Sequence, residues 1–255
     1  MNVKISPSDL FLLGLAVIGD ITETCLVGSS YAMRYNKLNW YFPPNYKKAN
    51  YTKTLYKKIK AKQINREVNL KNEQLKILLS TTGKQYLQDK FPLTLLQQKT
   101  WNKQWCLATF DIPESQKNTR NQLRRKLKQV GFAQLQKSLY ISPHPINSSL
   151  MELINALNLS KHVLVFQGKQ KHFTPTQKTI NRLWNLNSIK SDYFQVMKYT
   201  KKDHQKAVHQ YLQTVAQDPH LPFELLPPDW PATKAKLVIK QITSQPSPTT
   251  KRSFI

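Results

Sequence analysis

The chain has 255 residues, and its 39 Lys and Arg against 14 Asp and Glu give a formal net charge of +25. A hydrophobic content of 40% is enough for packed cores and excludes a globally disordered chain. The charge imbalance predicts attraction to a polyanion, either nucleic acid or an anionic membrane. A general preference of the organism for lysine codons is the alternative, but the charge is unevenly placed along the chain.

The two cysteines, Cys25 and Cys106, lie far apart in the sequence. They exclude a disulfide framework and a cysteine-rich zinc site, and free thiols suit a reducing cytoplasm, where we expect the protein. The apolar run Leu10 to Gly19 has about half the length of a membrane span. We therefore expect a buried core helix and no membrane partner.

The first expected domain, residues 1–98, begins with that helix. Ser6 or Ser8 can cap it, and its apolar side chains recur at helical spacing at Leu10, Leu13, Val17 and Ile21. Pro43 and Pro44 then interrupt the chain.

A second helix is predicted from Asn50, a suitable N-cap, to Asn65, with a buried face formed by Tyr51, Leu55 and Ile59. The segment 66–81 predicts two short strands joined by a turn at 71–73, and a last helix follows from Thr82 and Gly83. This order of elements is that of a winged helix-turn-helix domain.

Charge supports the same prediction, because no Asp or Glu occurs from Thr24 to Arg66. A recognition helix enters a groove lined by phosphates, which repel acidic side chains. The basic residues there are Arg34, Lys37, Lys47, Lys48, Lys53, Lys57, Lys58, Lys60, Lys62 and Arg66. We expect DNA contacts from Lys47, Lys48, Thr52, Lys53, Tyr56, Lys57, Lys60 and Arg66. A merely solvated helix face is the alternative.

The second expected domain, residues 99–200, opens with a buried strand that includes residues 105–112 and a helix over 115–130. Leu123, Leu127 and Val130 form the apolar stripe of the helix. Gly131 can adopt the left-handed backbone conformation that ends a helix. Arg120, Arg124 and Lys128 flank that stripe, and we expect this basic flank to contact DNA phosphates, with Arg120 and Arg124 as the candidate DNA-binding residues.

An extended stretch over 133–142, a helix over 150–159, a strand over 162–168 and a last strand near Tyr193 to Lys198 complete the domain. The resulting βαββαβ order predicts a ferredoxin-like fold. Residues 201–240 are expected to form a helical, proline-punctuated C-terminal element, and 241–255 a disordered tail. The fold class is therefore α+β.

Two segments resemble a known family. "WNKQWCLATFDIPESQKNTRNQLRRKLKQVGFAQLQKSLYISPHP", residues 101–145, resembles the central domain of PaaX-like transcriptional regulators, which is itself similar to the small CRISPR-associated endonuclease. "DPHLPFELLPPDWP", residues 218–231, resembles the C-terminal element of the same regulators. The resemblance implies a homodimer whose helix Tyr51 to Lys62 binds operator DNA. It also implies a small-molecule effector, in these regulators an aryl-acetyl coenzyme A thioester. The sequence has no glycine-rich phosphate loop, so it does not predict that ligand.

Asp111 has two interpretations. In the nuclease family an Asp at the end of the first strand binds a divalent metal at the dimer axis, and Asp111 matches that position. Alternatively it stands at a helix start, where an acid meets backbone N–H groups and the helix dipole, or pairs with Arg120 or Arg124. We favour the structural interpretation, since Asp111 and Glu114 are the only acids between Asp89 and Glu152 and a metal site needs several oxygen ligands.

The remaining candidates are weaker. The six histidines are scattered, and His204 and His209 are five residues apart, which does not fit a helical metal pair. We expect Trp101, Trp105, Trp184 and Trp230 in cores. Tyr31, Tyr35, Trp40, Tyr41 and Phe42 are expected to pack the first domain against its neighbours, with a ligand pocket or a dimer surface as alternatives.

Together these features predict a cytoplasmic, sequence-specific DNA-binding regulator, a repressor acting as a dimer, with no cofactor. The first alternative is a metal-dependent endonuclease that uses Asp111 with Mg²⁺ or Mn²⁺. The second is a non-specific polyanion-binding scaffold.

Overall fold

A computed structural model describes residues 5–24, 38–69, 71, 74–94, 101–169, 175–201 and 203–244. The chain divides into two compact units, both discontinuous in sequence. Unit 1 comprises residues 1–87, 190–217 and 231–255, and unit 2 comprises residues 88–189 and 218–230. Both contain helices and a small antiparallel sheet, which confirms the α+β class.

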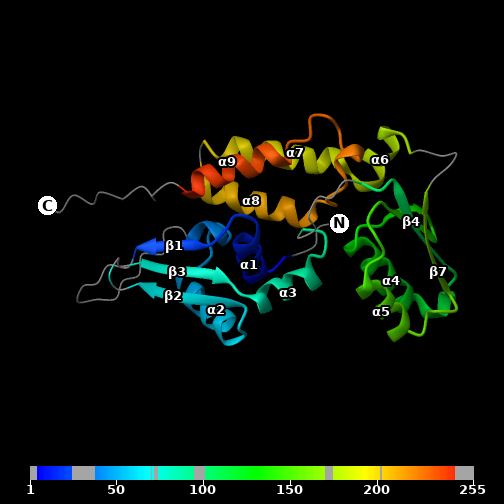
Figure 1. The fold of residues 1–255 in the computed structure, drawn as a ribbon, viewed down its shortest axis with the longest axis horizontal. Coiled ribbons are helices and arrows are strands. Elements are labelled where there is room, and N and C mark those ends of the chain that lie inside the picture. Colours follow the sequence, from blue (N-terminus) through cyan, green and yellow to red (C-terminus); the bar gives the residue numbers. More distant parts are fainter. Residues whose placement is uncertain are drawn as a thin grey trace. The chain divides into compact units, whose positions relative to one another are not determined.

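Unit 1 begins with three helices and a three-stranded sheet of order β1-β3-β2, in which both pairings are antiparallel (Figure 1). Its first elements are α1 (Pro7–Val17), β1 (Ile21–Thr24), the short 3₁₀ helix η1 (Leu38–Tyr41), α2 (Lys48–Lys60), β2 (Ile64–Asn69), β3 (Gln74–Leu79) and α3 (Thr81–Lys90). The last three residues of α3 fall in unit 2.

The predicted core helix is confirmed as α1, which Ser6 caps and which buries residues 10–15. Its predicted extension to Ile21 is wrong. Gly19 adopts a φ of 130°, which ends the helical path, and Ile21 instead pairs with Ile77 in the sheet. The predicted two-stranded ribbon is confirmed as β2 and β3, although residues 72 and 73 of its turn lie outside the described part of the chain.

The predicted second helix is α2, but it starts before Asn50 and ends before Asn65. Lys47 is the N-cap and gives no side-chain bond, so the expectation that Asn50 caps the helix is wrong. Tyr51 and Leu55 are buried as expected, whereas Ile59 is 39% exposed because the helix ends one residue later.

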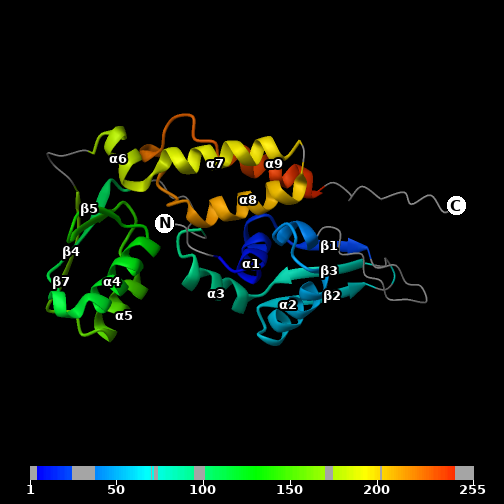
Figure 2. The same cartoon turned by 180° about the vertical axis from the view of Figure 1, so that it is seen from behind.

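Three C-terminal helices complete unit 1: α7 (Leu186–Tyr199, of which residues 190–199 belong here), α8 (His204–Gln217) and α9 (Ala232–Ser244). In both ribbon views α8 runs beside α9, and α8 also contacts α1 and η1 (Figures 1 and 2). The rings of Tyr193 and Tyr211 join α7 to α8 at a centroid distance of 6.4 Å. The amino-terminal sheet and helices therefore share a core with helices from the end of the chain.

The strand expected near Tyr193 to Lys198 is wrong, because this segment lies in α7. Ile189, Tyr193 and Val196 are buried at the spacing of one helix face, so a helix buries them where a strand would split them between two faces. Residues 241–244 of the expected tail continue α9, and residues 245–255 lie outside the described residues.

Unit 2 is built on a four-stranded sheet of order β5-β6-β4-β7 in which every neighbouring pair is antiparallel (Figure 1). Its elements are β4 (Gln104–Phe110), η2 (Glu114–Gln116), α4 (Lys117–Gln129), β5 (Ala133–Gln136), β6 (Leu139–Ser142), α5 (Ser148–Ala156), β7 (Val163–Lys169), α6 (Gln177–Trp184) and η3 (Phe223–Leu225). The single extended stretch expected over 133–142 is thus a hairpin, and β7 is the last strand in the described part of the chain.

The two faces of this sheet bury separate clusters. On one face Cys106, Ala108 and Phe110 of β4 join apolar residues that include Leu123 and Leu127 of α4. The other face buries Trp105, Trp184 and their neighbours, with Trp101 and Trp230 packed partly buried against them. The prediction that these tryptophans are core residues is confirmed for Trp105 and Trp184, whereas Trp101 and Trp230 are only partly buried. No helix among the described residues combines the length and apolar character needed to cross a membrane.

Candidate nucleic-acid interface

One side of α2 is open to solvent and polar. Its members, which we call the α2 face, recur at positions i, i+1, i+4, i+5 and i+8 and all are exposed: Thr52, Lys53, Tyr56, Lys57 and Lys60. Tyr56 is 67% exposed, an unusual place for a large aromatic ring. The opposite side buries Tyr51 and Leu55. The structure therefore brings five of the predicted DNA-contacting residues together on one surface.

The start of α2 rests on stacked aromatic rings. Phe42 stacks on Phe11 at 5.2 Å and on Tyr46 at 4.8 Å, and it tilts against Tyr51 at 4.9 Å. The hydroxyls of Tyr46 and Thr54 share a hydrogen bond of 2.9 Å. Burial raises the pKa of Tyr51, and nearby Tyr46 raises it further. Gln205 of α8 adds a bond from Nε2 to the Asn39 carbonyl of η1 at 2.9 Å, so a C-terminal helix helps to hold the segment before α2.

The end of α2 is fixed by a paired backbone turn. The Lys62 N–H donates to the Ile59 carbonyl at 2.8 Å, and the Gln63 N–H to the Lys58 carbonyl at 2.9 Å. This is the Schellman arrangement, and it places Lys62 in the left-handed region with φ 55°. The chain then passes directly into β2.

Residues at the start of α3 clamp that turn. The Ser80 N–H donates to the Gln63 carbonyl at 3.1 Å, and the Ser80 hydroxyl donates to the Lys62 carbonyl at 2.5 Å. A Cβ on Gly83 would overlap the Gln63 carbonyl oxygen, so glycine is what allows α3 to approach so closely. The turn between α2 and β2 is therefore held by its own backbone bonds, by the two bonds from Ser80 and by the close approach of Gly83.

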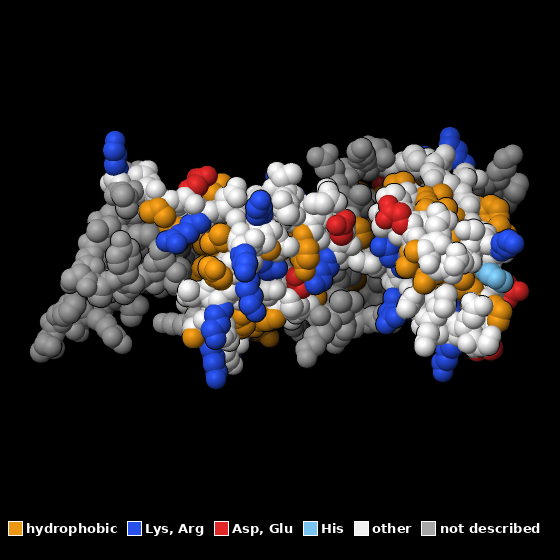
Figure 3. Space-filling view, turned by 90° about the horizontal axis from the view of Figure 1, so that it is seen from below, with side chains coloured by type: hydrophobic (Ala, Val, Ile, Leu, Met, Phe, Trp, Pro, Cys, Tyr) orange, Lys and Arg blue, Asp and Glu red, His pale blue; other side chains and the backbone are white. Residues whose placement is uncertain are grey.

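Further predicted residues flank the α2 face. Lys47 at the start of α2 and Arg66 on β2 are exposed, while the side chain of Lys48 lies outside the described residues, as do Arg34 and Lys37. β2 is an edge strand, and residues 65–69 all face solvent, including one acid, Glu67. Figure 3 shows Lys and Arg side chains projecting from the part of unit 1 that carries α2.

Arg120 and Arg124, also predicted to contact DNA, are engaged within unit 2. Arg120 forms a two-pronged pair with Glu114, in which Nη2 lies 2.7 Å from Oε2, and only 16% of its side chain is exposed. This hydrogen bond holds the pKa of Glu114 below its usual range and raises the pKa of Arg120. Arg124 donates to the Lys137 carbonyl at 3.1 Å and lies 5.8 Å from the centroid of the Phe110 ring.

The exposed cations of α4 are others, namely Lys117, Arg125 and Lys128. Sequence reasoning missed Lys117 and Arg125. Their signal was present in the helical spacing: counted from the buried Leu123 and Leu127, Arg120 and Arg124 lie at the border of the apolar stripe and Lys117, Arg125 and Lys128 lie farther around the helix.

Asp111 follows β4 and is exposed. Its backbone N–H donates to the His162 carbonyl at 2.9 Å, and its carbonyl contacts His162 Nδ1 at 2.9 Å. The helix-start interpretation is wrong, because η2 begins at Glu114 and α4 at Lys117. The arginines expected as its partners bond to Glu114 and Lys137 instead. Within the described residues, no group of three or more potential metal ligands occurs.

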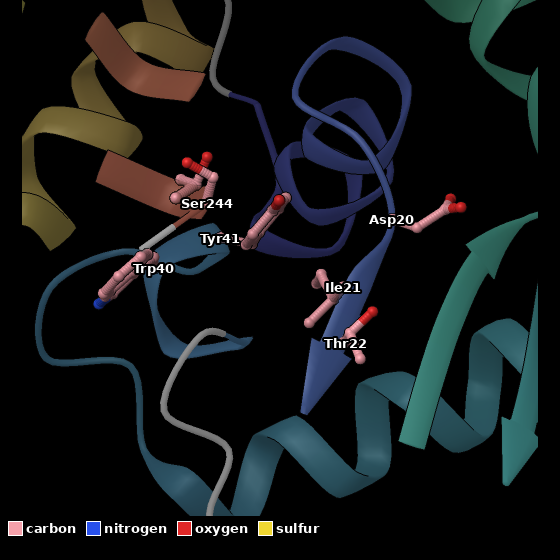
Figure 4. A pocket seen from close by; sticks show the side chains of 7 residues that line it. Asp20, Ile21, Thr22, Trp40, Tyr41 and Ser244 are labelled. Atoms are coloured by element: carbon pink, nitrogen blue, oxygen red, sulfur yellow. The ribbon is translucent and has the colours of Figure 1, made fainter. Parts of the chain in front are cut away.

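A small cavity of about 160 Å³ lies in unit 1, lined by residues 20–22, 40, 41, 243 and 244 (Figure 4). Three of its hydroxyl groups are already bonded, since Tyr41 Oη donates to the Gly19 carbonyl and Thr243 and Ser244 bond within α9. The Asp20 side chain points away from the other labelled side chains and lies 3.7 Å from Lys76. Tyr41 and Phe42 are core residues, and Tyr31 and Tyr35 lie outside the described residues.

Comparison with known proteins gives two family matches. Residues 98–180 match the PaaX protein central Cas2-like domain, and residues 195–254 match the PaaX-like protein C-terminal domain. Together they cover more than half of the chain. No curated protein matches. Among solved structures, an uncharacterized protein from Mycobacterium tuberculosis, Rv0674, is similar in fold with a TM-score of 0.55 at 15% identity, over 81% of this chain and 83% of that one.

Proposed function

Because the chain belongs to the PaaX-like family, whose members are generally transcriptional regulators, we propose that it is a sequence-specific DNA-binding regulator. The single observation that supports this best is the α2 face, a row of exposed lysines with Thr52 and Tyr56 on a helix that contains no acid. Lysines that neutralise phosphates release counterions, which favours binding, and hydroxyl groups between them can reach base edges.

The elements around α2 suit docking in a major groove. Their order, α1, β1, α2, β2 and β3, supports a winged helix arrangement, in which α2 is the recognition helix and the hairpin β2–β3 is the wing. The rigid turn at Lys62 fixes the direction of α2 relative to this hairpin. A helix held at both ends loses little conformational freedom on binding, which leaves more of its contact energy for recognition.

Unit 2 is proposed to serve assembly. Its element order and its strand order β5-β6-β4-β7 support a ferredoxin-like arrangement. We propose that two copies associate and bind a two-fold operator as a repressor in the cytoplasm, and that a small-molecule effector relieves binding. A dimer predicts two half-sites at a spacing of one helical turn or a multiple of it.

The exposed carboxylate of Asp111 at the end of β4 keeps metal-dependent cleavage of nucleic acid as a second candidate. Labelled RNA and duplex DNA incubated with the protein and Mg²⁺ or Mn²⁺, beside the variant Asp111→Asn, decide between the two. Cleavage that exceeds the level of the variant would support the nuclease. Equal, background-level signals reject it.

The test of the regulator is selection from a random duplex pool. A regulator enriches a defined motif, because matched sites bind about 10³–10⁷ times more tightly than random DNA. An arrangement of two related half-sites would support the dimer. If repeated rounds retain DNA without enriching any sequence, the protein is a polyanion scaffold and the proposal fails.

A further inference from the structure

The helix α4 of unit 2 carries six Lys and Arg and no acid within its 13 residues, KNTRNQLRRKLKQ. At 100° per residue, five of these cations fall within an arc of about 140°. They are Arg120, Arg124, Lys117, Lys128 and Arg125, in order around the helix. The remaining exposed side of the helix carries amides, so the positive charge is gathered on one side.

The two ends of this arc behave differently. Arg120 and Arg124, beside the buried stripe, are held by Glu114 and by the Lys137 carbonyl. Lys117, Arg125 and Lys128, which we call the α4 face, are exposed. The pair with Arg120 offsets the charge of Glu114, the acid three residues before α4, and α4 itself contains no acid.

The exposed uncharged residues of α4 indicate which polyanion fits. They are Asn118, Asn121, Gln122 and Gln129, of which Gln129 already donates to the Asp89 and Lys90 carbonyls, and none of them is apolar. A helix that binds a membrane surface needs an apolar face to bury, and a protein interface usually has aromatic or aliphatic anchors. Amides and cations together suit phosphate and sugar oxygens, which receive about half to two-thirds of protein–DNA hydrogen bonds.

We propose that the α4 face is a second nucleic-acid contact that binds the phosphodiester backbone of duplex DNA independently of sequence. It rests on the proposed function, because it adds to the binding of an operator. The α2 face reads sequence, and the α4 face contributes affinity and salt dependence from a different unit of the chain.

The test uses the full-length protein and the variant Lys117→Gln/Arg125→Gln/Lys128→Gln. Its control is Lys169→Gln/Lys178→Gln/Arg182→Gln, which removes two lysines and one arginine that are also exposed in unit 2. Both variants lower the net charge by the same amount. Fluorescence anisotropy measures Kd at several KCl concentrations for the selected duplex and for a scrambled duplex of equal length.

Log K falls linearly as log [KCl] rises. In the α4 variant the magnitude of this slope should be smaller by about three, since each lost phosphate contact lowers it by roughly one. Affinity for the two duplexes falls by the same factor, so their ratio is unchanged. The control keeps the wild-type slope. Single variants at the three positions, each expected to lower the slope by about one, serve if circular dichroism shows that the triple variant is unfolded.

Equal slopes for the α4 variant and its control overturn the inference. The inference is also overturned if the α4 variant loses binding to phosphatidylserine vesicles but keeps wild-type DNA binding, which would assign the face to a membrane. If the wild-type protein binds both duplexes equally, the proposed function fails. A smaller salt slope in the α4 variant would still show the backbone contact.

Discussion

The helices α2 and α4 are alike in sequence and differ in the roles proposed for them. Both have 13 residues, are rich in cations and contain no acid. On α2 the exposed cations are lysines that alternate with Thr52 and Tyr56. On α4 three of the six cations are arginines, Arg120 and Arg124 bond to Glu114 and to the Lys137 carbonyl, and the exposed uncharged residues are amides.

The contacts that hold the two helices in place also differ. The end of α2 is held by backbone bonds at Lys62 and Gln63 and by the close approach of Gly83. On α4, side chains make the linking bonds, from Arg120 to Glu114 and from Arg124 to the Lys137 carbonyl. Charge alone therefore does not separate the two roles proposed for these helices. The proposed difference rests on how each helix is held and on the uncharged residues beside its cations.

The largest effect on stability is expected where α3 packs against the turn that follows α2. In Gly83→Ala the new methyl group overlaps the Gln63 carbonyl, and the free energy of unfolding should fall by about 1–3 kcal/mol. Gly168→Ala is the control, because a Cβ there meets no atom within 4 Å. Urea unfolding of both variants measures the difference. Two equally stable variants would show that α3 does not clamp the turn.

Removing one tyrosine hydroxyl from each unit should change the free energy of unfolding in opposite directions. Tyr46 shares a hydrogen bond with Thr54 beneath α2, so Tyr46→Phe should lose about 1 kcal/mol of unfolding free energy. Tyr140 is fully buried near Arg124, and its hydroxyl has no hydrogen-bond partner among the described residues. Tyr140→Phe should therefore gain up to about 1 kcal/mol. Thermal unfolding by calorimetry gives both values, and a change of the same sign in both would contradict this contrast.

A smaller gain is expected at the left-handed turn of α2. Lys62→Gly removes the steric cost of φ 55° and should stabilise the fold by about 0.5–1 kcal/mol. Lys60→Gly, two residues earlier and inside α2, loses the same charge and should cost about 1 kcal/mol. Chemical denaturation of the pair gives the sign of each change. Destabilisation by both would argue against the Schellman turn.

Elements governed by local signals were predictable. Ser6 and the apolar run after it predicted α1, and the alternating segment after Arg66 predicted the hairpin β2–β3. The exposed side of α2 followed from the spacing of Tyr51 and Leu55. In each case neighbouring residues supply both the signal and the structure.

Features that depend on distant partners were not predictable. Ile21 fits a helix stripe and a strand equally well, and only its pairing with Ile77 decides. The burial of α8 against α1 and η1 comes from residues some 160 positions apart, such as Gln205 and Asn39. Arg120 pairs with Glu114, six residues before it across the η2–α4 junction, whereas the sequence alone presents the two residues as separate exposed charges.

The most direct test of the central claim measures binding of the selected duplex by two double variants. They are Lys53→Glu/Lys57→Glu on α2 and Lys236→Glu/Lys240→Glu on α9. Both pairs are exposed, four residues apart on a helix of unit 1, and change the net charge equally. The α2 face predicts loss of specific binding at every salt concentration for the first variant and near wild-type affinity for the second. Equal affinities of the two variants would contradict it.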